Sequence, residues 1–116
     1  MRKPFTQFFG EADHSFHLEP SLVLELERRL GSGIGAIYRR FISADFGFAD
    51  LTQVIRLGLI GGGMEPKNAA ELVEVYGARM SVSELYMVAL PVMEALMTGD
   101  ALQRVAKSPR KRKADR

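Results

Sequence analysis

The sequence predicts a mainly α-helical fold of the α+β class, in which an N-terminal β-hairpin precedes a bundle of about five short helices. Apolar residues recur three and four positions apart over most of residues 20–99, and proline or glycine separates these segments. Short apolar runs on either side of a turn-forming segment come before residue 20. Residues 107–116 are polar and charged, so we expect one domain over residues 1–106 and a disordered basic tail over residues 107–116.

The hairpin is predicted from residues 5–18. Phe5–Phe9 is apolar enough for a short strand, residues 10–13 are turn-forming, and His14–Leu18 alternates between apolar and polar side chains. A two-stranded hairpin is only marginally stable by itself. We therefore expect it to pack on the helices or to pair with another subunit.

Two helices are predicted next. Pro20 suits the first turn of a helix that runs to about Leu30, where Gly31 can form its C-terminal end. A second helix is expected over about Ile34–Ala44. In the loop after it, Phe46 and Phe48 are expected to pack onto the core.

The segment Leu51–Pro66 is the predicted centre of the fold, because its helix is apolar on nearly every side and must be covered on nearly every side. This helix can begin at Asp45 or at Ala49–Asp50. Its main stripe holds Leu51, Val54, Ile55, Gly58 and Leu59, with Leu57 and Ile60 on the opposite side. Its polar edge is formed by Thr52, Gln53 and Arg56.

Glycine residues give this segment its most distinctive motif, which consists of Gly58, Gly61, Gly62 and Gly63 followed by Pro66. We interpret Gly58 as a place of close helix packing. We interpret the three consecutive glycines as a flexible, sterically open connection to the helix that Pro66 starts. A phosphate-binding loop is disfavoured, because no strand precedes the run and no Gly-Lys-Ser/Thr follows it.

The fourth predicted helix starts at Pro66 and ends at Gly77. A fifth helix follows Ser81, which stands three residues before Glu84 in the spacing of a capping box. Pro91 is expected on the far face of that helix, where it would bend the helix.

Four apolar residues lie outside the main stripe of the fifth helix: Met87, Val88, Leu90 and Val92. They give more apolar surface than a small monomer readily covers, which suggests a surface for self-association or for a partner protein. The alternative, that the hairpin and the other helices cover them, is equally open.

No catalytic, cofactor or metal site is predicted. The chain has no cysteine, and no serine or threonine stands in a nucleophile motif. On a strand His14 and His17 point to opposite faces, so one ion could not bind both without a bulge. The chain also has neither a membrane-length apolar segment nor a signal-peptide core, so we expect a soluble, intracellular protein.

Positive charge is concentrated at the C-terminus. Residues 107–116 contain six basic and one acidic residue, while the rest of the chain contains ten basic and thirteen acidic residues. The run Arg110, Lys111, Arg112 and Lys113 is suited to contact nucleic acid or another anionic surface. A solubilising tail is the simpler interpretation.

A resemblance to a known family rests on Val54–Met64, followed by Pro66, Ala69, Leu72, Val73 and Tyr76. These residues resemble the small phage-tail proteins of gene transfer agents, which are phage-like tail assembly chaperones of α-proteobacterial prophages. The resemblance covers most of residues 10–99 but neither Phe5–Phe9 nor the basic tail. It implies a non-catalytic protein of tail morphogenesis in the bacterial host cytoplasm, which coats tape-measure or tail-tube protein before polymerisation.

Two alternatives remain open at this point. The chain is also suited to be a minor structural component that stays in the virion. From another class, it is suited to be a small nucleic-acid-binding module that acts through its basic tail.

Overall fold

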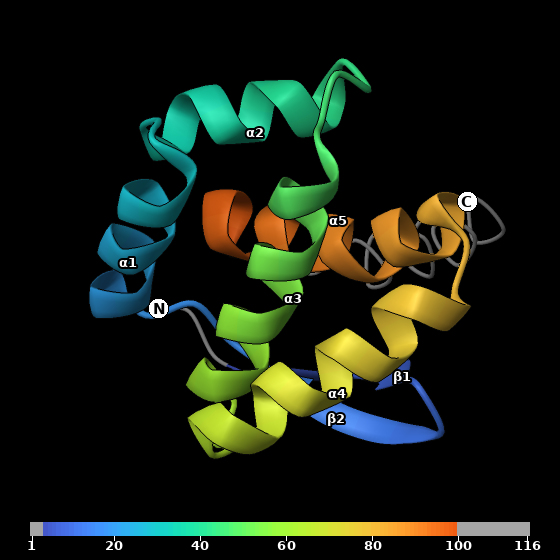
Figure 1. Cartoon of the computed structure of the whole chain (residues 1–116). Coiled ribbons are helices and arrows are strands. Elements are labelled where there is room, and N and C mark those ends of the chain that lie inside the picture. The colour runs from blue at the N-terminus through green and yellow to red at the C-terminus, as the bar shows by residue number, and fades with distance from the viewer. Residues whose placement is uncertain (1–3, 100–116) are drawn as a thin grey trace, which may run out of the picture.

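The computed structural model describes residues 4–99 and shows an N-terminal hairpin followed by five helices in that part of the chain (Figure 1). The strands are β1 (Phe5–Phe9) and β2 (Ala12–Phe16), and the helices are α1 (Pro20–Leu30), α2 (Ile34–Ile42), α3 (Phe48–Gly61), α4 (Pro66–Arg79) and α5 (Val82–Thr98). The predicted fold class is confirmed. The predicted tail lies outside the described residues, and the division at residue 106 stays a prediction.

Helix α3 is the central element. In Figure 1 it runs through the middle of the molecule, with α1 to its left, α2 across the top and α5 behind it. It contacts α1, α4, α5 and β2. Because neighbours cover it on several sides, its buried residues include Leu51, Val54, Ile55, Leu57 and Leu59. The prediction of a central helix is confirmed.

The hairpin is tighter than its sequence suggested. Phe9 pairs with Ala12, so the turn has only the two residues Gly10 and Glu11 rather than the expected segment 10–13. Gly10 has a φ of +74°, and a two-residue hairpin turn needs such a left-handed residue at its first position. Phe16 is fully buried against the helices, which is how the hairpin gains stability.

The glycines at the end of α3 provide close backbone contact with the hairpin. A Cβ on Gly61 would lie 1.8 Å from the carbonyl oxygen of His17, and a Cβ on Gly62 would lie 1.9 Å from that of Ser15. One turn earlier, the carbonyl of Gly58 accepts a hydrogen bond of 3.0 Å from the backbone N–H of His17. The expectation of a sterically open connection is therefore wrong for Gly61 and Gly62. It holds for Gly63, where a Cβ would meet nothing within 4 Å.

A partly buried ion pair joins α2 to the start of α3. The Nε and Nη2 atoms of Arg40 donate to the two carboxylate oxygens of Asp50 at 2.9 and 2.8 Å. The backbone N–H of Gly47 donates to the same carboxylate at 2.8 Å, which caps α3. Burial raises the pKa of Asp50, but the hydrogen bonds from Arg40 and Gly47 outweigh it and hold the pKa below its ordinary value.

This cap explains one wrong expectation about the preceding loop. Gly47 ends the loop, so α3 begins at Phe48, and the Phe48 side chain is 54% exposed instead of packed onto the core. Phe46 does pack as expected, since its ring stacks on that of Tyr86 with centroids 4.7 Å apart. The ring of Phe41 lies beside both of them.

Three further local expectations differ from the structure. Gly77 does not end α4, which continues to Arg79, because a glycine inside a helix costs only about 1 kcal/mol relative to alanine. Helix α2 stops at Ile42 rather than at residue 44. Pro91, which was expected on the far face of α5, is buried, because α3 and the hairpin cover more of α5 than one stripe.

Candidate partner-binding surface

The four α5 residues predicted to bind a partner do not form one exposed surface. Met87 is 63% exposed and Leu90 is partly buried, whereas Val88 and Val92 are 7% and 1% exposed. Neighbouring elements lie against this part of α5: the side-chain amide of Gln7 on β1 donates to the carbonyl of Val88 at 2.9 Å, and the Val92 side chain lies close to Gly58 of α3. Only Met87 and part of Leu90 are available to a partner here.

Large apolar side chains are exposed on most of the elements. They are Phe8, Leu24, Ile42, Phe48, Val75, Val82, Met87 and Met97, each at least 42% exposed. Single exposed apolar residues are normal, but those that border a groove mark a place where another chain can bury area. Phe48 borders one groove, and Leu24 and Met97 border another.

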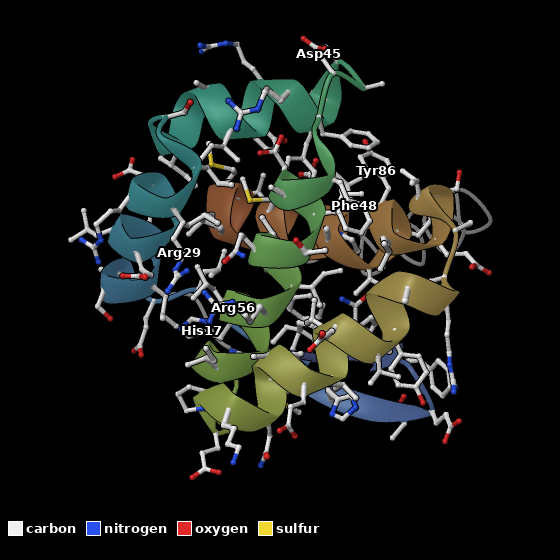
Figure 2. The ribbon with its side chains drawn as sticks, viewed as in Figure 1. His17, Arg29, Asp45, Phe48, Arg56 and Tyr86 are labelled. Carbon is white, nitrogen blue, oxygen red and sulfur yellow. The ribbon has the colours of Figure 1, made fainter. Side chains whose placement is uncertain are left out.

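The first groove lies between α3 and α4 and has a volume of about 390 Å³. It is lined by Phe48, Thr52, Gln53, Arg56, Ala70, Val73, Glu74, Gly77 and Ala78. Its α4 wall is formed largely by small side chains, which is why neighbouring helices leave space there. Figure 2 shows Phe48 near the start of α3 and Arg56 further along the same helix.

Arg56 is a half-buried cation in this groove. Its Nε and Nη2 atoms donate to the side-chain oxygen of Gln53 at 3.2 and 2.9 Å, and among residues 4–99 no carboxylate pairs with it. Burial lowers the pKa of the Arg56 guanidinium, and the charge of Arg29 lowers it further, against the opposing effect of Glu25. Arg29 is already bound to Glu25 at 2.6 Å. The groove therefore contains a partly desolvated positive charge with which no carboxylate of residues 4–99 forms an ion pair.

The second groove, of about 500 Å³, lies between α1 and the end of α5. It is lined by Pro20, Val23, Leu24, Glu27, Ile34, Leu96 and Met97. Its single charged residue, Glu27, already accepts a hydrogen bond of 2.8 Å from the backbone N–H of Ile34. Apart from this carboxylate, the residues that line the groove are apolar.

Within residues 4–99, no cluster of three or more His, Asp or Glu side chains is placed to hold a metal ion. None of the helices in that range combines the length and apolar character needed to cross a membrane. Arg110, Lys111, Arg112 and Lys113 lie outside the described residues.

Comparison with known proteins identifies the family. The profile of the family described as "Phage tail tube protein, GTA-gp10" matches residues 3–99. The chain belongs to this family. The GTA-gp10 match spans the hairpin, all the described helices and both grooves, so it confirms the resemblance found in the glycine-rich segment. It makes the chain a protein associated with the tail of a phage or gene transfer agent. No curated protein and no solved structure matches the chain.

None of the residues that line the α3–α4 groove was predicted as a site residue. Arg56 was recognised only as part of a polar edge, and Phe48 was assigned to the core. A spacing signal was present, because Phe48 stands four residues before Thr52 and thus shares its edge of the helix. The α4 wall gave no such signal, since it depends on how two helices pack.

Proposed function

We propose that this member of the GTA-gp10 family is a non-catalytic tail assembly chaperone. It binds tape-measure or tail-tube protein in the cytoplasm of the bacterial host before the tail polymerises. Family membership supports a role with tail proteins. The observation that carries the proposal is the set of exposed apolar side chains beside two open grooves, which suits protein–protein contact.

The distribution of all the exposed apolar side chains, including those that border neither groove, favours a temporary contact over a permanent one. Permanent subunits bury large, continuous apolar interfaces. Here the exposed apolar residues are spread over separate elements, such as Phe8 on β1, Ile42 on α2 and Met87 on α5. A minor structural component of the tail is the second candidate, and the family's description as a tail tube protein is what favours it.

Co-expression distinguishes these two candidates. We expect the full chain to co-purify with the tape-measure or tail-tube protein of the same phage or gene transfer agent, and to be absent from purified particles. Size-exclusion chromatography measures the first result, and quantitative mass spectrometry of the particles measures the second. A fixed stoichiometry in mature particles would instead establish the structural role, and failure to bind either tail protein would refute both.

Deletion of residues 107–116 tests the nucleic-acid alternative. We expect the shortened chain to bind its tail partner as the full chain does, because the proposed contacts lie within residues 4–99. Binding of both chains to duplex DNA is measured at several salt concentrations, since contacts of the six basic residues would weaken as salt rises. The nucleic-acid module would be favoured if the full chain bound neither tail protein but bound DNA in a salt-sensitive way, and if the deletion abolished that DNA binding.

A further inference from the structure

We propose that the α3–α4 groove binds an acidic amphipathic helix of the tail partner, with an apolar side chain beside Phe48 and a carboxylate on Arg56. The inference rests on the proposed chaperone function, and it specifies the surface that is used and the chemistry of the segment that is recognised. The groove is distinct from the α5 residues predicted from the sequence, of which Val88 and Val92 are buried.

The shape of the groove favours a helix. It is bounded by two helices, and Ala70, Gly77 and Ala78 leave room for the side-chain ridge of a third helix. An amphipathic helix in a groove is a recurring mode of peptide recognition, with apolar anchors repeated at helical spacing. Phe48 provides the apolar contact at one position, because more than half of its surface is exposed.

The charge of the groove favours an acidic residue on that helix. Arg56 has its guanidinium partly buried, and its only hydrogen-bond acceptor in the described chain is the neutral amide of Gln53. A carboxylate can bind a guanidinium through two parallel hydrogen bonds, which makes the pair both strong and specific.

The separation of the two anchors gives a spacing for the partner. Phe48 and Arg56 are eight residues apart on α3, which corresponds to about 12 Å along the helix axis. A partner helix that lies along α3 would therefore present its apolar anchor and its carboxylate roughly seven or eight residues apart. The α1–α5 groove offers no comparable pair of anchors for an acidic helix, because none of the residues that line it is a cation.

The test uses the full chain co-expressed with tape-measure or tail-tube protein. In one arm, Phe48→p-benzoylphenylalanine is irradiated and the cross-linked peptide is mapped. In a second arm, the affinities of the variants for the tail protein are measured; the variants are Phe48→Ala, Arg56→Glu and Arg56→Lys. Ile42→Ala and Arg39→Glu serve as matched controls, because they change an exposed apolar residue and an exposed arginine on α2, away from the groove. Circular dichroism confirms that each variant is folded.

We expect the cross-link to map to a partner helix that has Asp or Glu about seven or eight residues from the linked position. Arg56→Glu should weaken binding about tenfold or more, and Phe48→Ala should weaken it several-fold. The affinity of Arg56→Lys for the tail protein should lie between those of Arg56→Glu and the wild type. Replacing the partner's carboxylate by lysine should restore binding to Arg56→Glu. The two control variants should bind as the wild type does.

Two results would overturn the groove assignment while leaving the chaperone function intact. One is wild-type affinity in both Phe48→Ala and Arg56→Glu. The other is a cross-link from position 48 to a second copy of this chain instead of to the tail protein. Absence of binding between the wild-type chain and either tail protein would count against the proposed function itself, so the two failures are distinguishable.

Discussion

Adding one methyl group at Gly61 or at Gly62 is expected to lower the free energy of unfolding by about 3 kcal/mol. The new Cβ would lie 1.8 Å from a carbonyl oxygen of the hairpin at Gly61 and 1.9 Å from another at Gly62. Such contacts are with backbone rather than with a flexible side chain, so the hairpin must move away from α3. That movement would also strain the hydrogen bond between the N–H of His17 and the carbonyl of Gly58.

Gly35→Ala is the matched control for this experiment. Gly35 lies within α2, and a Cβ there would meet nothing within 4 Å. Alanine is favoured over glycine inside a helix by about 1 kcal/mol, so this variant should be as stable as the wild type or more stable. Urea unfolding followed by circular dichroism measures all the variants. Equal stability of Gly61→Ala and Gly35→Ala would show that the hairpin does not lie against α3 in solution.

Asp50→Ala is expected to lower the free energy of unfolding by about 2 to 3 kcal/mol. The substitution leaves the guanidinium of Arg40 without its two hydrogen bonds and removes the side chain that caps α3 at Gly47. This loss of stability is smaller than the roughly 3 to 5 kcal/mol expected when a fully buried pair is broken, because the Arg40 side chain is 28% exposed and water can solvate it. Chemical denaturation at neutral pH measures the change.

Glu25→Ala is the matched control for the ion pair. Glu25 pairs with Arg28 and Arg29 on the surface of α1, where water and salt screen the interaction. We expect only a small change in stability for this variant. If Glu25→Ala lowered the free energy of unfolding as much as Asp50→Ala does, burial of Asp50 would not be the reason why its ion pair stabilises the fold.

The Asp50 pair also makes stability depend on pH in the acid range. The pKa of Asp50 is lowered in the folded chain below the ordinary value of 3.8. The ionised carboxylate therefore stabilises the folded state fully when the pH is above that value. Stabilisation is lost as the pH falls through the lower, folded-state pKa, where the carboxylate takes up a proton. The difference in unfolding free energy between the wild type and Asp50→Asn should therefore narrow from about pH 5 to about pH 2. A constant difference would show that another effect of the substitution dominates.

Much of the helical framework could be predicted from local signals. Pro20 and Pro66 each start a helix, and Gly31 has the left-handed conformation expected after α1. The capping box of α5 is formed as its spacing indicated, with the Glu84 N–H donating to the Ser81 hydroxyl at 3.1 Å and the Ser81 N–H donating to the Glu84 carboxylate at 2.8 Å. These features involve residues within one turn of each other, so the sequence contains all the information they need.

Of the two walls of the α3–α4 groove, only the α3 wall could be predicted from the sequence. The polar edge of α3, with Gln53 and Arg56, follows from helical periodicity, and Phe48 shares that edge by spacing. The opposite wall, with Ala70 and Ala78, joins the site only because α4 packs beside α3. A groove between two helices has no local signal, since both its shape and the exposure of its residues depend on the packing.

The sequence by itself determined the order of the elements, the central position of the glycine-rich helix and the family to which the chain belongs. Tertiary structure alone decided which apolar faces are covered and which glycines must be glycine. Val88 is buried, and a hydrogen bond from Gln7, 81 positions earlier in the chain, to its backbone carbonyl holds β1 beside α5. Gly61 and Gly62 are required where a distant backbone approaches them. Burial and close contact depend on such long-range neighbours, whereas helix starts and ends depend on residues within a turn.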